Sequence, residues 1–106
     1  MSTPRWQDTL SRLFTRYEAK VQLHREQMHA SIGPEITQRT LDLCRHAIGG
    51  IDRLSEDKAN RWLGFVQGVM IASRVLDIEE ERNFTRPLFH ELKGPSETID
   101  TRLPKS

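Results

Sequence analysis

The sequence predicts an all-α protein, a compact helical bundle of three main helices plus a short C-terminal helix. Apolar residues recur three and four positions apart over three long segments, and no segment shows the alternation of a strand. With 36% hydrophobic and 29% charged residues, the composition is that of a folded chain. A chain of 106 residues suits one domain. We therefore expect a single helical domain over residues 1–92 and a disordered polar tail over residues 93–106.

The first helix is expected from Pro4, with Thr3 as its N-cap, to about Ala30. Gly33 and Pro34 then disfavour its continuation. One face of this helix is apolar and carries Trp6, Leu10, Leu13, Phe14, Tyr17, Val21 and Met28. The pattern predicts one long amphipathic helix.

A second helix is expected over residues 34–54, where Gly49-Gly50 is the weak point. Each glycine costs about 1 kcal/mol relative to alanine in a helix interior. The pair therefore indicates a kink, a frayed turn or the true end of the helix. The apolar face of this segment carries Ile36, Leu43, Cys44, Ala47, Ile48 and Ile51.

The third helix follows Ser55, a suitable N-cap, and is apolar nearly all round between residues 59 and 76. Gly64, Gly68 and Ala72 lie four residues apart and form a ridge without bulk along one side. Close packing of another helix would offset the roughly 2 kcal/mol that two glycines cost. We expect this ridge to be an internal helix crossing, and the alternative is a groove for a ligand or partner.

Asp77 and Glu80 have the spacing of a capping box, which predicts a fourth helix from Ile78 to about Thr85. Proline in a helix interior removes a hydrogen bond and disfavours helical conformation in the preceding residue. We therefore expect Arg86-Pro87 to interrupt the helix before a short apolar segment at residues 88–92.

The chemistry of the chain argues against an enzyme. Glu26 and His29 form a Glu-x-x-His pair, but di-iron bundles need a second such motif, which is missing from the sequence. Cys44 and His46 are two residues apart and so point to different faces of a helix. We predict no catalytic residue, no metal site and no cofactor, with Cys44 as a buried, unreactive thiol.

Charge and hydropathy limit the partners of the chain. A formal net charge of +1 makes nucleic acid an unlikely partner. No apolar run approaches the roughly 18 residues of a membrane span, and one cysteine cannot form an internal disulfide. We expect a cytoplasmic protein with no membrane contact. Because the long first helix could expose apolar surface, we also expect a homo-oligomer.

Two groups of residues are candidates for binding. Arg12, Arg16 and Lys20 form a basic stripe on the first helix, while residues 77–92 carry a net charge of −3. This segregation indicates internal complementarity, self-association or an acidic surface for a basic partner. Arg61 and Trp62 could frame a pocket for a planar or anionic ligand, although the spacing of Trp62 also fits the core.

The segment Asn60-Arg61-Trp62-Leu63-Gly64-Phe65-Val66-Gln67-Gly68, with Glu81-Arg82 and residues 85–90, resembles short uncharacterised helical proteins encoded by tailed phages and prophages. This resemblance implies a small accessory role on a mobile element. The pair Arg61-Trp62 is also similar to an Arg-Trp pair in helical phage sponge proteins that sequester cyclic-nucleotide immune signals.

We therefore expect a small non-enzymatic phage or prophage accessory protein that binds a host protein and inhibits or redirects it, in host takeover or anti-defence. One alternative is a sponge that sequesters a nucleotide-type immune signal. Another is a small nucleic-acid-binding regulator.

Overall fold

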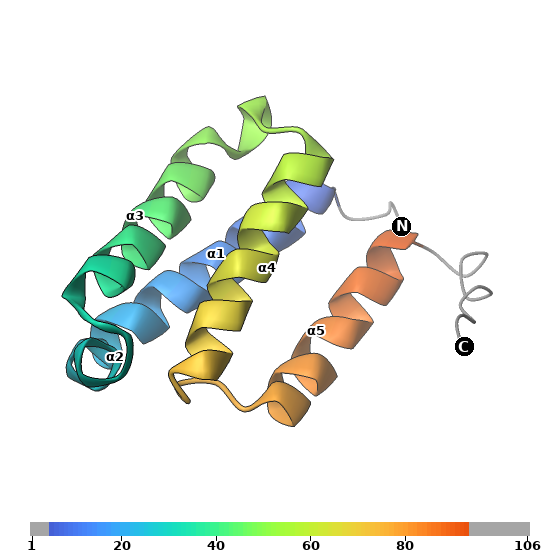
Figure 1. Cartoon of the computed structure of the whole chain (residues 1–106). Helices are drawn as coiled ribbons and strands as arrows, with labels where there is room; N and C mark the ends of the chain where they lie inside the picture. The colour runs from blue at the N-terminus through green and yellow to red at the C-terminus, as the bar shows by residue number, and fades with distance from the viewer. Residues whose placement is uncertain (1–4, 94–106) are drawn as a thin grey trace.

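The computed structural model describes residues 5–93, and this part of the chain is all-helical: helices cover 89% of it and it contains no strand (Figure 1). The predicted all-α class is therefore confirmed, although five α-helices are present in this part. They are α1 (Trp6–Leu23), α2 (Arg25–Ile32), α3 (Pro34–Gly50), α4 (Glu56–Ala72) and α5 (Ile78–Lys93), with a 3-10 turn η1 (Ile51–Arg53). The predicted cap at Thr3-Pro4 and almost all of the predicted tail lie outside the described residues.

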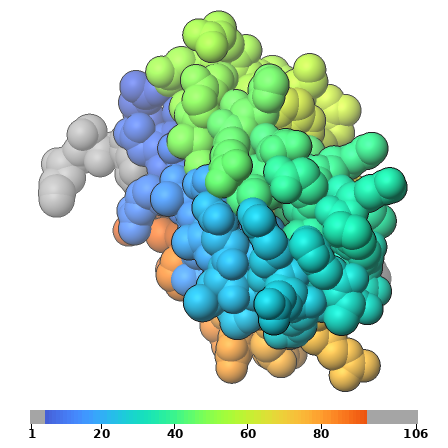
Figure 2. All heavy atoms as spheres, turned by 90° about the vertical axis from the view of Figure 1, so that its left-hand side faces the viewer, coloured from blue at the N-terminus to red at the C-terminus, as the bar shows by residue number. Residues whose placement is uncertain are grey.

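The helices α3, α4 and α5 form a layer, and α1 lies across one side of it (Figure 1). The core occupies the space between α1, α3 and α4. Its largest fully buried side chains are those of Tyr17 and Phe14 on α1. On the side away from α5, the atoms of α1, α2 and α3 meet in a continuous surface (Figure 2).

The predicted single first helix is wrong, because the chain breaks at His24 into α1 and α2. His24 has φ −110° and ψ 26°, outside helical values. The break turns α2 onto α3 and buries Met28 completely. Burying a methionine stabilises the fold by roughly 1.5–3 kcal/mol. The break itself keeps helical backbone hydrogen bonds, because the His24 amide donates to the Lys20 carbonyl and the Met28 amide to the His24 carbonyl, both at 3.0 Å.

The structure shows how the chain passes from the second predicted helix to the third. The helix expected over residues 34–54 is shorter, because α3 ends at Gly50 and the 3-10 turn η1 follows. Of the three alternatives for Gly49-Gly50, the true end of the helix is the one observed. The Ser55 hydroxyl accepts a hydrogen bond from the Lys58 backbone amide at 3.1 Å. This confirms Ser55 as the N-cap of α4.

The predicted internal crossing at Gly64, Gly68 and Ala72 is wrong. All three residues are exposed, and a Cβ atom added at either glycine would meet no atom of another described element within 4 Å. The buried face of α4 is instead made by Ala59, Leu63, Val66 and Met70. A ridge of small residues permits close approach of a helix, but in this chain it points away from the core.

The start of α5 is as predicted, and its course is not. The Asp77 carboxylate accepts hydrogen bonds from the backbone amides of Glu79 (2.9 Å) and Glu80 (3.0 Å), so it caps the helix. The predicted interruption at Arg86-Pro87 is wrong, since α5 continues through Pro87 to Lys93. Pro87 and Asn83 are exposed, so water can bind the Asn83 carbonyl that proline leaves without a helical donor.

Candidate functional site

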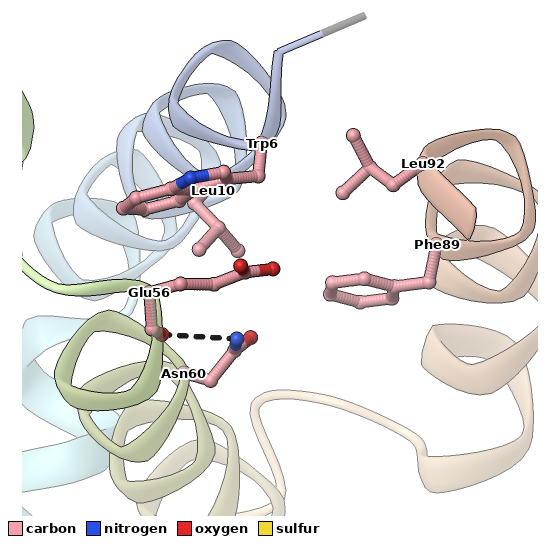
Figure 3. A pocket seen from close by; sticks show the side chains of 6 residues that line it. All are labelled: Trp6, Leu10, Glu56, Asn60, Phe89 and Leu92. Carbon is pink, nitrogen blue, oxygen red and sulfur yellow. Dashed lines mark hydrogen bonds between the residues drawn. The ribbon is translucent and has the colours of Figure 1, made fainter. Parts of the chain in front are cut away.

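A cavity of about 350 Å³ lies at one end of the bundle, between the first turns of α1 and α4 and the last turns of α5 (Figure 3). A volume of this size is at the lower end of the range for ligand sites. Six residues line the cavity: Trp6, Leu10, Glu56, Asn60, Phe89 and Leu92.

Three helices place these side chains. Trp6 and Leu10 are four residues apart on α1, and Phe89 and Leu92 are three apart on α5, so each pair shares one face of its helix. Figure 3 shows Trp6 and Phe89 on opposite sides of the space, with Leu92 above Phe89. Leu10 is buried and forms the part of the lining that belongs to the core. The cavity therefore has an aromatic and aliphatic lining on two sides.

Glu56 and Asn60 bring acceptor oxygens to the cavity from α4. The Asn60 side-chain amide donates to the Glu56 backbone carbonyl at 3.0 Å, which leaves the amide oxygen Oδ1 as its acceptor. The Glu56 side chain extends from α4 into the space toward Phe89 (Figure 3). Glu56 lies in the first turn of α4, where the helix dipole makes an acidic side chain stabilising.

A buried polar network holds α5 in the position that closes the cavity. Glu81 of α5 accepts a hydrogen bond from the Tyr17 hydroxyl and pairs with Arg16 Nη2 at 3.1 Å. The Gln67 side-chain amide donates to the Tyr17 oxygen at 2.9 Å, which joins α4 to the same network. Burial, followed by the hydrogen bond to Glu81, raises the pKa of Tyr17 well above its ordinary value. The network fixes α5 against both α1 and α4.

The predicted basic stripe does not form one binding surface around this cavity. Arg16 pairs with Glu81, and its guanidinium carbon lies 3.9 Å from the centre of the Phe84 ring. This supports internal complementarity as the reason for the segregated charge. Arg12 is exposed and Lys20 is half-buried.

Arg61 and Trp62 are adjacent in sequence but point in different directions. Arg61 is exposed and lies 3.8 Å from Asp57 on the outer side of α4. Trp62 is half-buried and meets the His46 ring of α3 edge to face, with ring centres 6.3 Å apart. Neither residue lines the cavity between α1, α4 and α5.

Sequence reasoning missed the cavity because each lining residue had another role in the helical pattern. Trp6 and Leu10 were expected in the apolar face of the first helix, and Phe89 and Leu92 in the packing of the last segment. Glu56 is equally well explained as an acidic residue in the first turn of a helix, where the helix dipole stabilises negative charge. No local signal distinguishes these roles from the lining of a cavity.

The other chemically active groups are separate from this site. Burial raises the pKa of the Cys44 thiol to about 12, which keeps it protonated at neutral pH. Within residues 5–93, no three His, Cys, Asp or Glu residues gather as metal ligands would. None of the described helices combines the length and the apolar character that crossing a membrane requires.

Comparisons with protein-family models, with curated proteins and with solved structures found no match for this chain. The function is therefore inferred from the geometry of the described residues and from the chemistry of their side chains.

Proposed function

We propose that this chain is a small non-enzymatic phage or prophage accessory protein that binds a host protein and inhibits or redirects it. The observation that carries the proposal is the cavity formed by α1, α4 and α5. It opens to the surface, has aromatic and aliphatic walls, and holds two converging polar groups. Protein partners are commonly anchored by one side chain that enters a pocket of this kind.

Exposed apolar side chains on α4 and α5 support binding of a polypeptide. Phe65 on α4 is 42% exposed, and Ile78, at the end of α5 away from the cavity, is 51% exposed. The glycine and alanine ridge of α4 lies on the same exposed side of this helix as Phe65. A partner anchored in the cavity could bury these apolar groups. The ridge of small residues would allow the partner's backbone to approach the backbone of α4 closely.

The nucleotide-sponge alternative is less well supported by the same geometry. The cavity contains the Glu56 carboxylate, whose negative charge repels the phosphate oxygens of a nucleotide. Arg61 and Trp62, which carry the resemblance to sponge proteins, are outside it. The nucleic-acid alternative is weakened by the internal pairing of Arg16 and the net charge of +1.

Site-specific photo-crosslinking in a bacterial extract tests the proposal. One variant carries benzoylphenylalanine in place of Phe89, at the cavity, and its control carries it in place of Gln38, an exposed residue of α3. We expect one discrete crosslinked protein from position 89 and not from position 38. The same products from both positions, or none from position 89, would refute binding through this site.

A thermal-shift series tests the rival. A nucleotide in large excess over its Kd raises the melting temperature by several degrees, because it binds only the folded chain. We expect no shift with mononucleotides, dinucleotides or cyclic nucleotides. A shift that Arg61→Ala abolishes would instead favour the sponge.

A further inference from the structure

We infer that the cavity between α1, α4 and α5 recognises a cationic side chain of the partner, an arginine guanidinium on its alkyl stem. The inference rests on the proposed function and names the group that the partner presents. It follows from the combination of acceptors and aromatic rings in one small space.

The carboxylate of Glu56 and the amide oxygen of Asn60 favour a ligand that donates hydrogen bonds. Carbonyl oxygen can only accept, so the Asn60 atom that faces the Glu56 carbonyl at 3.0 Å is the amide nitrogen. Asn60 thus keeps its oxygen and one N–H for a ligand, and Glu56 offers two carboxylate oxygens, so acceptor atoms outnumber the free N–H of these two residues. A guanidinium has five N–H donors and no acceptor, and its planar shape matches a carboxylate with two parallel hydrogen bonds.

The aromatic and aliphatic walls suit the same group. Trp6 and Phe89 stand on opposite sides of the Glu56 carboxylate, and a cation near an aromatic face is attracted by the ring quadrupole. Leu10 and Leu92 provide apolar contact for a methylene stem. Arginine is preferred to lysine because its flat, weakly hydrated head both stacks on rings and pairs with a carboxylate.

Apolar or anionic side chains of a partner would leave the Glu56 carboxylate without a favourable interaction. A purely apolar side chain would remove water from the Glu56 carboxylate without replacing its hydrogen bonds, which is costly. An anion would be repelled by the same carboxylate. Among the described residues, no ion pair involves Glu56, and Arg5 at the start of α1 pairs with Asp52 at 3.0 Å instead.

A titration followed by NMR tests the inference on the whole chain. The probe is N-acetyl-arginine-methylamide, and the matched neutral probe is the citrulline analogue, which replaces the guanidinium by a urea of the same shape. The indole N–H signals of Trp6 and Trp62 report on two places in the same sample. We expect the arginine probe to shift the Trp6 signal at millimolar concentration, with Trp62 unchanged and with citrulline at least about fivefold weaker.

Two variants make the test specific. Glu56→Gln keeps the shape of the side chain and removes its charge, and we expect it to weaken arginine binding by about fivefold or more. Asp57→Asn removes the same charge one residue along α4, from a side chain that is 89% exposed outside the cavity. We expect Asp57→Asn to bind arginine as the original chain does.

Equal binding of arginine and citrulline, equal loss in Glu56→Gln and Asp57→Asn, or a shift at Trp62 alone would overturn the inference. The proposed function fails separately. If the arginine probe does not bind but position 89 still crosslinks one protein, the partner presents another group. If the probe binds as expected but no protein crosslinks, the site recognises a cation and the proposed host-protein function is wrong.

Discussion

Glu81 on α5 and Tyr17 on α1 share a hydrogen bond inside the bundle, although 64 residues separate them in the chain. The Glu81 side chain also pairs with Arg16, and Tyr17 is fully buried. A buried carboxylate is tolerated only where donors replace its lost water, and here a hydroxyl and a guanidinium do so. This contact fixes the position of α5 and therefore the cavity that its last turns close.

Replacing Glu81 by alanine should lower the free energy of unfolding by about 2–3 kcal/mol. The change leaves the Tyr17 hydroxyl without its acceptor and Arg16 without its partner. Because the Arg16 side chain is 33% exposed, water recovers part of the loss. Urea denaturation measures the effect, and Glu91→Ala, at an exposed site on the same helix, is the control and should change stability by less than about 0.5 kcal/mol. A similar loss in both variants would contradict the role of the network.

Stability should fall with rising pH above about 9. Burial raises the pKa of Cys44 from 9.0 to about 12, and burial also raises the pKa of Tyr17 above its ordinary 10.0. Below these ordinary pKa values, Cys44 and Tyr17 are protonated in both the folded and the unfolded chain, so they do not make stability depend on pH. Above them the unfolded chain loses its protons first, which favours unfolding by about 1.4 kcal/mol per pH unit for each group.

Urea melts between pH 8 and pH 11 check this prediction. Cys44→Ala removes the thiol, so the decline in this variant should begin about one pH unit higher, where Tyr17 alone remains. A profile for Cys44→Ala that matches the original chain throughout would show that the Cys44 thiol makes no contribution.

Arg74 adopts a left-handed backbone conformation, with φ 66°, where the chain leaves α4. Its side chain is exposed, and glycine adopts the conformation without a Cβ clash. Arg74→Gly should therefore raise the free energy of unfolding by about 0.5–1 kcal/mol relative to Arg74→Ala, measured by urea denaturation. If alanine proves the more stable of the two, relief of left-handed strain is not what decides stability at this turn.

Local signals predicted much of the fold. The caps at Ser55 and Asp77 each depend on residues within one turn, so the sequence pattern is sufficient. The glycine pair left three alternatives open, and the end of α3 at Gly50 was not predicted. The break at His24 has no such signal. It depends on contacts between α2 and distant parts of the chain. One example is the Gln27 side-chain amide, which donates hydrogen bonds to the carbonyls of Ser73 (3.2 Å) and Arg74 (3.3 Å) at the end of α4.

The cavity could not be predicted for a related reason. Its lining comes from three helices, and their separation depends on where α5 docks. That position follows from the contact between Glu81 and Tyr17, which no periodicity reveals. The sequence did place the apolar residues of α5 on one face, and it could not show that Phe89 is only partly covered.

The exposed glycines of α4 give a further prediction, opposite to the result that an internal crossing would require. An internal crossing would make any side chain at Gly64 or Gly68 clash, whereas a Cβ atom at either position meets no other described element within 4 Å. Gly68→Ala should therefore raise the free energy of unfolding by about 0.5–1 kcal/mol, because alanine has the higher helix propensity. Gly64→Leu should likewise not destabilise the chain.

Gly33→Ala is the matched control for these variants, because Gly33 has φ +91°, which a side chain strains, and equally open space around it. It should lose about 1–3 kcal/mol in the same urea melts. The opposite changes in the free energy of unfolding at positions 33 and 68 would then come from backbone conformation alone. If Gly64→Leu and Gly68→Ala both lose stability, another surface must lie against α4, and a concentration-dependent midpoint would identify that surface as a second copy of the chain.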